Sequence, residues 1–360
     1  MSVYLGIILF IIIVSLSLFN QDSEYVLVSN QIRVRGFGFK IFLIGFVLFF
    51  FAGFRYFVGA DYAQYASNFA AYCTQKLSWN HEPGIRIVAK MCSVIYKHYF
   101  VMFVGMSIIT VGLCVRTIEK NSRFFLISIL LYIFLGCWHE SFNSVMQSAA
   151  VAILFWGHQF IKERKLTKWI LICIIAFFFH KSAIVFFLLY FIPRNNISFW
   201  KVAFLALIGV AVALVYDRVW GIISVIEHDF VIDQYALNQI NIFRIAVAWA
   251  PILFFFLFLK RTRYFDDCED KETLNLYAMT SVLNAAILLG ARNSTYLGRA
   301  ALFTDIYNTL FWAHMFSLFP KEKKNTTAWI IVVLLCYFVF YLNEASGEFL
   351  NHYRWIFGNI

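Results

Sequence analysis

The sequence predicts an all-α fold, a polytopic transmembrane bundle of about twelve helices, from its composition, its apolar runs and the spacing of its basic residues. Hydrophobic residues make up 62% of the 360 residues and charged residues only 14%, with a mean hydropathy of +0.74. A soluble domain carries roughly 45–50% apolar and about 25% charged residues. Apolar runs recur along the whole chain, so we expect one integral membrane domain over residues 1–360.

Each helix is predicted where an apolar run approaches the roughly 17–25 residues that cross a hydrocarbon core. The first run, 3–19, follows no Lys or Arg and has no small-residue cleavage site, which indicates a retained helix rather than a signal peptide. Between two short runs, His180 and Lys181 mark either a tight hairpin or a break in a longer bent element. The remaining helices are expected at 41–54, 98–115, 124–138, 145–161, 169–180, 182–193, 199–216, 245–259, 274–290, 300–319 and 328–342.

Basic residues predict the orientation, because loops on the cytoplasmic side retain Lys and Arg. Clusters of these residues occupy alternate loops, at 33–40, 116–123, 162–168, 194–201, 260–271 and 321–324. The long segment 55–97 then lies outside and is expected to contain short re-entrant or interfacial helices. The net charge of +10 comes from basic residues in short clusters between apolar runs, where they set the orientation in the membrane. No nucleic-acid partner is therefore expected. Both termini are placed outside, together with the segments 55–97, 139–144, 217–244, 291–299 and 343–360.

Arginines on this outer face are candidate phosphate ligands, because a guanidinium binds phosphate through a bidentate fork and stays ionised near lipid. Arg55 follows the second predicted helix, Arg244 begins the ninth, and Arg292 and Arg299 flank a short outer connection. If these side chains converge, they form a pocket for a pyrophosphate headgroup. The alternative is that each one reaches separately to the lipid interface or pairs with an acid.

The segment 55–65, with the sequence RYFVGADYAQY, holds the densest group of polar and aromatic residues. Gly59 permits a sharp turn that returns the chain over the membrane surface. Asp61 is a candidate general base or a ligand of sugar hydroxyls, while Tyr62 and Tyr65 offer aromatic faces and hydroxyls suited to carbohydrate. The alternative is an ion pair between the arginine and the aspartate that closes a loop.

Two more polar groups interrupt the apolar runs. Glu140, Asn143 and Gln147 lie at a predicted outer junction, where the last two share one helical face at spacing i, i+4. They are candidate ligand-binding residues, or they join helices within the bundle. His180 ends the run 174–179, where an imidazole is a candidate base for a hydroxyl proton; capping a helix end is its alternative role.

No metal or cofactor site is predicted. The sequence contains no HExxH, no DxD in an outer loop, no P-loop and no glycine-rich nucleotide fingerprint. Asp229 and Asp233 stand four residues apart, which is only a weak signal of a metal site.

Short motifs follow one another in a fixed order that resembles the EpsG-like group of Wzy polysaccharide polymerases. They span nearly the whole chain: Arg55 to Tyr65, Glu82-Pro83-Gly84, Phe142-Asn143 with Gln147, Phe179 to Ala183, and Arg299-Ala300 with Phe303. One position departs from the group's pattern, because its members carry Arg before Gln in an Asn-x-x-Arg-Gln motif and this chain has Met146. The phosphate contact that the group's arginine implies is therefore not predicted at Met146, and another arginine is a candidate to replace it.

The resemblance implies a membrane glycosyltransferase that polymerises undecaprenyl-pyrophosphate-linked oligosaccharide repeat units without a cofactor. The site would face the periplasm or exterior of a bacterial inner membrane, in O-antigen, capsule or exopolysaccharide synthesis. His180 and Asp61 then compete for the role of base, and Arg299 with the other arginines stabilises the departing charge. A Wzz-type chain-length regulator is a candidate partner. The alternatives are a flippase for the same lipid-linked units, a glycan ligase, or a membrane acyltransferase.

Overall fold

The computed structural model describes residues 1–16, 25–28, 31–34, 37–76, 82–194, 197–226, 239–260, 262–319, 324–345 and 352–357. The chain forms two compact units. The first comprises Met1–Trp156, Leu171–Ile184 and Tyr341–Ile360, and the second comprises Gly157–Ile170 and Val185–Phe340. The single membrane domain over 1–360 stays a prediction.

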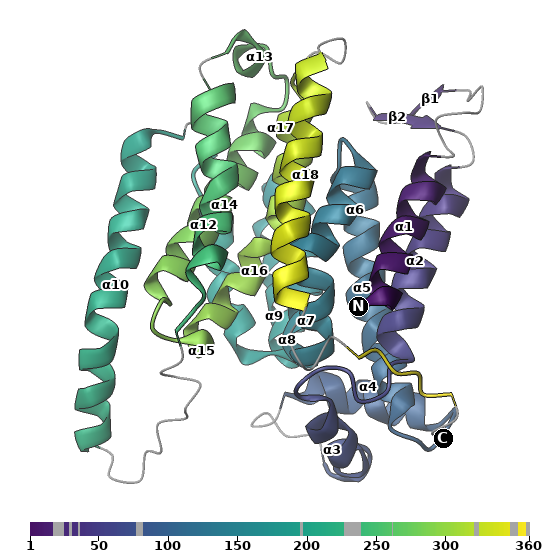
Figure 1. The fold of residues 1–360 in the computed structure, drawn as a ribbon. Coiled ribbons are helices and arrows are strands. Elements are labelled where there is room, and N and C mark those ends of the chain that lie inside the picture. Colours follow the sequence, from purple (N-terminus) through teal and green to yellow (C-terminus); the bar gives the residue numbers. More distant parts are fainter. Residues whose placement is uncertain are drawn as a thin grey trace. The chain divides into compact units, whose positions relative to one another are not determined.

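The first unit begins with two apolar helices. Its later helices match predicted runs or lie in the long segment 55–97, except Cys137–Asn143, most of which falls in the predicted outer connection 139–144. Its strands β1 (Tyr25–Val28) and β2 (Gln31–Val34) pair as an antiparallel hairpin, the one described element that the all-α prediction does not include. Its helices are α1 (Ser2–Leu16), α2 (Phe37–Gly53), α3 (Tyr62–Thr74), α4 (Pro83–Ser93), α5 (Phe100–Asn121), α6 (Phe125–Phe134), α7 (Cys137–Asn143), most of α8 (Val145–Lys162) and the end of α9 (Leu166–Phe179) (Figure 1).

Helices α3 and α4 confirm that the segment 55–97 contains short helices. Helix α4 begins with Pro83 at its first position, where the missing N–H of proline costs no hydrogen bond. One face buries Ile85, Val88 and Ala89, whereas Ile87 and Met91 are exposed. A short helix that exposes apolar side chains on its outer face is typical of a membrane interface.

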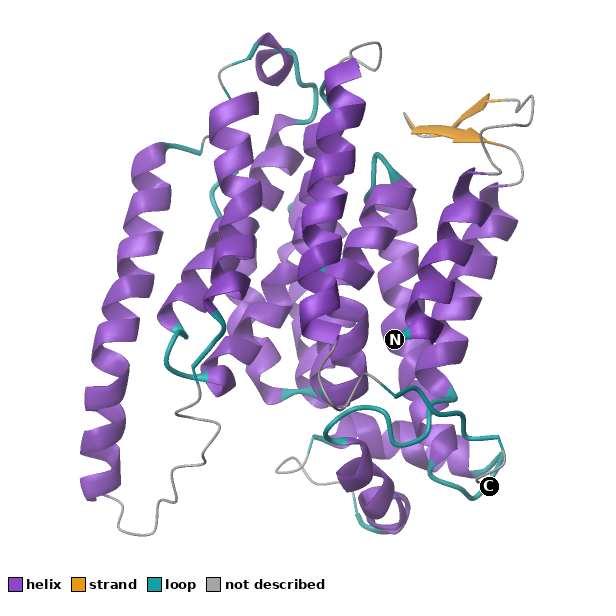
Figure 2. Ribbon diagram, viewed as in Figure 1, coloured by secondary structure: helices purple, strands orange, loops and turns teal. Residues whose placement is uncertain are grey.

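The described elements of the second unit are all helices. Helix α14 is buried along most of its length and packs against both α10 and α12. Its elements are the 3-10 helix η1 (Lys181–Phe191, shared with the first unit), α10 (Phe199–Ile226), α12 (Ile242–Phe254) with the π-helical turn η2 (Phe255–Leu259), α13 (Arg263–Asp266), α14 (Lys271–Gly290), α15 (Thr295–Gly298), the 3-10 turn η3 (Arg299–Ala301), α16 (Leu302–Asp305), α17 (Tyr307–Ser317) and most of α18 (Lys324–Ala345) (Figure 2).

Helices α9 and η1 form a tight hairpin with His180 at its tip. The indole N–H of Trp169 in α9 donates to the carbonyl O of Phe187 in η1 at 3.1 Å. These residues are 18 positions apart, and a straight helix of that length would separate them by roughly 27 Å. The hairpin alternative is therefore confirmed, and the long bent element is excluded.

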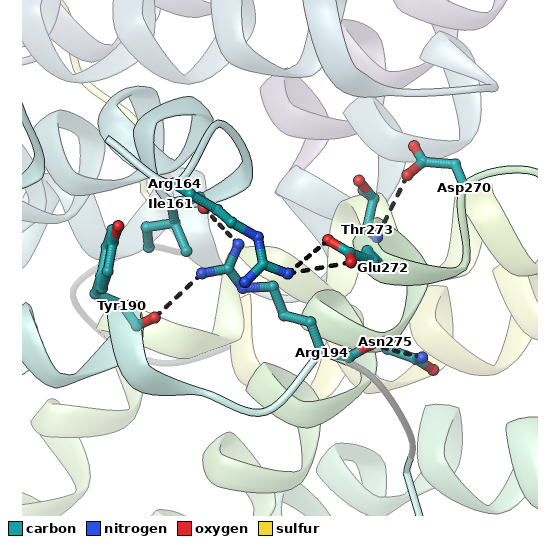
Figure 3. Close-up of polar contacts among 8 residues, drawn as sticks. All are labelled: Ile161, Arg164, Tyr190, Arg194, Asp270, Glu272, Thr273 and Asn275. Carbon is teal, nitrogen blue, oxygen red and sulfur yellow. Dashed lines mark hydrogen bonds and ion pairs between the residues drawn. The ribbon is translucent and has the colours of Figure 1, made fainter. Parts of the chain in front are cut away.

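Polar contacts fix the other end of this hairpin within the second unit (Figure 3). Arg194 donates from Nη1 to the carbonyl O of Ile161 at 2.7 Å, and the amide of Asn275 donates to the carbonyl O of Arg194 at 2.8 Å. Nearby, Arg164 Nη2 lies 3.0 Å from Glu272 Oε2. Both side chains of that pair are 58% exposed, so their ion pair contributes little stability.

The described helices make a polytopic membrane protein, but the predicted number of spans, about twelve, is not confirmed. Helices α6 and α7 meet at 42° and form one further candidate as a bent pair. Four of the described helices are long and apolar enough to cross a membrane: Phe100–Asn121, Ile242–Leu259, Lys271–Gly290 and Thr326–Ala345. The shorter apolar helices are Ser2–Leu16, Gly38–Gly53, Leu166–Phe179, Lys181–Phe191 and Phe199–Val215.

Candidate active site

The motif that begins at Arg55 is held from one side by the C-terminal segment of the chain. The N–H of Tyr56 donates to the carbonyl O of Arg354 at 2.9 Å, and the N–H of Ile356 donates to the carbonyl O of Phe54 at 3.0 Å. These two bonds form an isolated antiparallel bridge between Arg55 and Trp355. The turn after α2 is therefore anchored by a segment that is distant in the sequence.

The Arg55 side chain is buried and hydrogen-bonds to main-chain carbonyls. Its Nε donates to Val58 O at 3.1 Å, its Nη2 to Phe142 O at 3.2 Å, and its Nη1 to Ala52 O. The guanidinium also lies between aromatic rings, with Cζ 4.8 Å from the ring centroid of Phe103. Burial lowers the pKa of Arg55 to about 10, so the group stays charged at neutral pH.

This geometry differs from the predicted role of Arg55 as a pyrophosphate ligand. Only 1% of the residue is exposed, and each guanidinium nitrogen has a carbonyl acceptor. The alternative ion pair with Asp61 is not formed either. Arg55 instead ties the end of α2 to the end of α7, and we assign it a positioning role.

Gly59 and Asn143 complete this junction between the motif and α7. Gly59 has a φ of +108°, and a Cβ at that position would lie 2.4 Å from the carbonyl O of Phe142. Both the left-handed backbone and the close approach require glycine. The N–H of Ala60 donates to Asn143 Oδ1 at 2.8 Å. The predicted turn at Gly59 is confirmed, and the side chain of Asn143 holds it by accepting the hydrogen bond from Ala60.

Tyr62 and Tyr65 are buried on the first turn of α3, and Asp61 immediately precedes them. The Tyr62 ring stacks on Phe103 with centroids 4.3 Å apart, and its hydroxyl donates to the carbonyl O of Arg55 at 3.1 Å. Burial and the nearby charge of Asp61 raise the pKa of Tyr65. Asp61 occupies the N-cap position of α3 but its carboxylate accepts no capping hydrogen bond. Asp61 is half-buried, and its carboxylate does not cap the helix.

The hairpin tip brings His180 to Glu82, at the start of α4. His180 Nδ1 lies 2.7 Å from Glu82 Oε1, with the two side chains 30% and 19% exposed. The separation is that of an ion pair when the imidazole is protonated. The N–H of Lys181 also approaches the same oxygen, at 3.3 Å.

The charge balance at Glu82 favours its ionised form. Burial by itself raises the pKa of this carboxyl, but the contacts with His180 and the N–H and charge of Lys181 outweigh burial, and the net pKa is lowered. Glu82 is not among the predicted site residues. Its only signal in the sequence is its place in the motif Glu82-Pro83-Gly84.

Gly84 explains how the two motifs approach so closely. A Cβ at Gly84 would lie 2.7 Å from the ring of Phe179 and 3.0 Å from the carbonyl O of Phe178. Any larger residue would displace the start of α4 from the end of α9. The Glu82-Pro83-Gly84 motif and the motif from Phe179 to Ala183 are therefore two halves of one contact.

One hydrophobic cluster of the first unit, which we call the motif cluster, supports all these contacts. Its buried members come from α3, α4, α5 and α8, and Phe179 and Met146 are partly buried against it. The Tyr65 hydroxyl hydrogen-bonds to the main chain of Met146. Residues of two motifs, Tyr62 with Tyr65 and Phe179, thus share one core with residues that adjoin the other two. The buried members are Tyr62, Tyr65, Ile85, Val88, Ala89, Met102, Phe103, Met106, Val145 and Ala149.

The remaining predicted residues of this region lie at the α7–α8 junction. Glu140 is half-buried in the short helix α7, and Gln147 is 5% exposed in the first turn of α8. Among the residues that the structure describes, no three His, Cys, Asp or Glu side chains form a group suited to a metal ion.

The other predicted arginines belong to the second unit. Arg244 lies in the first turn of α12, and Arg292 and Arg299 are exposed on the connection from α14 to α16. The N–H of Ile240 donates to the carbonyl O of Arg292 at 2.8 Å, and a Cβ at Gly298 would lie 2.5 Å from Ile240 Cδ1. The two connections that carry these arginines therefore touch each other within this unit.

The chain matches the model of one protein family, the EpsG family, over residues 39–355. No curated protein and no solved structure matches it. The matched range includes every motif described above, both those that join in the first unit and Arg299 in the second. Because the match extends over nearly the whole chain, the protein belongs to the EpsG family, the membrane-integral relatives of Wzy-type polymerases in polysaccharide synthesis.

Proposed function

We propose that this protein polymerises oligosaccharide repeat units carried on undecaprenyl pyrophosphate, and that the motif cluster carries the base of the reaction. The observation that supports this most is the contact between His180 Nδ1 and Glu82 Oε1, 2.7 Å apart. It joins two motifs of the family beside the core that buries Tyr62 and Tyr65 of a third. Site assembly from distant segments is what a catalytic role of these motifs requires.

His180 is proposed as the base in preference to Asp61. A carboxylate at Nδ1 favours the imidazole tautomer that carries its proton there, which leaves Nε2 as the acceptor. Glu82 would then hold the ring in orientation and stabilise the imidazolium that forms. Asp61 has no such partner and is proposed to bind sugar hydroxyls.

The reaction then follows a simple displacement. The acceptor hydroxyl gives its proton to Nε2 of His180, and its oxygen forms a bond to the anomeric carbon of the donor. The bond between that carbon and the phosphate oxygen breaks, and undecaprenyl pyrophosphate leaves with the electron pair. Cations that meet the departing charge lower the barrier. Arg244, Arg292 and Arg299 remain proposed for this task on the family resemblance.

The carbohydrate would be held by residues around the motif cluster. Tyr62 and Tyr65 supply aromatic surface, and Glu140, Asn143 and Gln147 supply polar groups at the α7–α8 junction. We place this site on the periplasmic or outer side of the cytoplasmic membrane, with a Wzz-type regulator as a candidate partner. The positive-inside pattern of the loops supports that orientation.

The test is the length of the surface polysaccharide in cells that carry variants of this gene. Cells with His180→Gln should retain normal protein levels and attach single repeat units in place of long chains, because the base is lost. Glu82→Gln should shorten the chains less, because the imidazole remains but loses its partner. His98→Gln, at another partly buried histidine of the first unit, is the control and should give chains of normal length.

Two results would contradict the proposal. Long chains of normal distribution from His180→Gln would remove His180 from the mechanism. Complete loss of surface glycan after gene deletion, without single repeat units, would indicate a flippase or a ligase.

A further inference from the structure

We propose that Arg86, on α4, is the residue that binds the diphosphate of the lipid carrier, in place of the arginine that this chain lacks at position 146. The inference rests on the proposed function and names a further residue of the same site. It starts from the burial of Arg86 and from the groups around it.

Arg86 is a buried cation without an acidic partner. Only 6% of the residue is exposed, and its Nη1 donates to the carbonyl O of Lys76 at 3.0 Å. Its Nε is buried and makes no hydrogen bond, and none of the ion pairs between described residues includes Arg86. A buried guanidinium with an unused donor is costly unless an anion completes its surroundings.

The position of Arg86 relates it to the Glu82–His180 contact. Arg86 follows Glu82 by four residues, which is about one helical turn. The charges of Arg86 and Glu82 both act on Tyr72, on α3. Burial raises the pKa of Tyr72 most, a hydrogen bond with Asn68 and the charge of Arg86 lower it, and the charge of Glu82 raises it; the net pKa is raised. The cation therefore lies on the side of α4 that faces the polar residues of α3.

The departure at position 146 supports the same assignment. Met146 is partly buried against the motif cluster, and Ile85 and Val88, which lie close to Arg86 on α4, are buried members of that cluster. A cation missing from α8 is thus supplied by α4 beside the same core. A guanidinium fork suits the oxygens of a diphosphate better than an ammonium does. The alternative role is structural, as a clamp on the carbonyl of Lys76.

Binding of farnesyl diphosphate to the purified full-length protein in detergent separates these roles. Arg86→Gln should weaken binding about tenfold or more, the loss expected when a charge-assisted hydrogen bond is removed. Arg86→Lys keeps the charge without the fork and should weaken it by a smaller factor. Lys90→Gln is the matched control, because Lys90 is on the same helix and donates to the neighbouring carbonyl O of Gln75 at 3.0 Å.

Competition identifies which part of the ligand is recognised. Inorganic pyrophosphate should displace farnesyl diphosphate from the wild type and much less effectively from Arg86→Gln. Equal displacement by phosphatidylglycerol micelles would indicate a general anionic-lipid site and would overturn the proposal. Unchanged affinity in both Arg86 variants, or an equal loss in Lys90→Gln, would overturn it as well.

The assay also distinguishes this inference from the proposed function. Thermal unfolding of each variant reports whether it is folded, and if Arg86→Gln does not fold, Arg86→Lys still decides the outcome. Diphosphate binding needs no polymerisation. Normal chain lengths from His180→Gln together with Arg86-dependent binding would therefore reject the polymerase base and retain the diphosphate site.

Discussion

At the scale of single residues, the first unit uses charged side chains for two different purposes. Arg55 donates its hydrogen bonds to the carbonyls of Ala52, Val58 and Phe142, and these bonds fix the turn after α2. Glu82 instead faces His180 with both side chains partly accessible. Arg55, whose three guanidinium nitrogens all have carbonyl acceptors, holds the loop, whereas Glu82 and His180 stay accessible enough to meet a substrate.

The lowered pKa of Glu82 predicts an acid-sensitive component of stability. The folded state holds this carboxyl ionised more strongly than the unfolded chain does, so its contribution is full above the ordinary value of 4.5. The contribution is lost as the pH falls through the lower folded-state pKa. Thermal unfolding in detergent, measured from about pH 6 to about pH 3, should show a steeper loss in the wild type than in Glu82→Gln.

The control for this measurement is Glu163→Gln. Glu163 pairs with Lys165 at 2.7 Å, but both side chains are about half exposed, so removing this carboxylate should leave the pH profile close to that of the wild type. Identical profiles for the wild type and Glu82→Gln would show that the Glu82 contacts do not stabilise the fold.

At the scale of elements, the site depends on how α4 meets the tip of the α9–η1 hairpin. The contact has no room for a side chain at Gly84, since the ring of Phe179 and the carbonyl of Phe178 lie against it. The hairpin tip then sets the position of His180, and the first residues of α4 set that of Glu82. Small shifts of either element change the distance between the two groups.

Gly84→Ala should therefore reduce polymer length even though it introduces only a methyl group. The added Cβ would stand 2.7 Å from a rigid aromatic ring, so α4 must move away from Phe179 and carry Glu82 away from His180. Chain length on a gel and the thermal unfolding temperature of the purified variant are the measurements. We expect a clear loss of chain length with a modest loss of stability.

Gly112→Ala is the matched control at the level of the helix. A Cβ at Gly112 meets nothing within 4 Å, and the residue lies inside α5, where alanine favours the helix by roughly 0.5–1 kcal/mol. This variant should keep normal chains. Equal effects of the two substitutions would mean that helix packing at Gly84 is unrelated to the site.

At the scale of the whole molecule, the sequence predicts which side of the membrane each connection faces, and two native cysteines test it. Cys73 on α3 belongs to the segment predicted outside, and Cys268 to the loop predicted in the cytoplasm; neither forms a disulfide, and both are partly exposed. In single-cysteine variants, a membrane-impermeant maleimide added to intact cells should label Cys73 and not Cys268. Labelling of Cys268 alone would invert the proposed orientation.

The sequence predicts features that depend on neighbouring residues and misses those that depend on contacts between distant residues. Apolar runs are local, so every predicted helical segment contains a described helical element, and Gly59 marks its turn correctly. The hairpin at His180 stayed ambiguous because it is decided by a contact between Trp169 and Phe187. Arg55 and Glu82 depend on partners 87 and 98 positions away, which no local pattern reveals.

The bridge between Arg55 and Trp355 has a consequence for how the protein is made. The hydroxyl of Tyr353 also donates to the carbonyl O of Phe51 at 2.7 Å, across 302 positions of the chain. During synthesis, the turn after α2 leaves the ribosome long before the C-terminal segment that pairs with it. Membrane insertion of the intervening helices must come first, so the earliest motif to be translated is among the last to close.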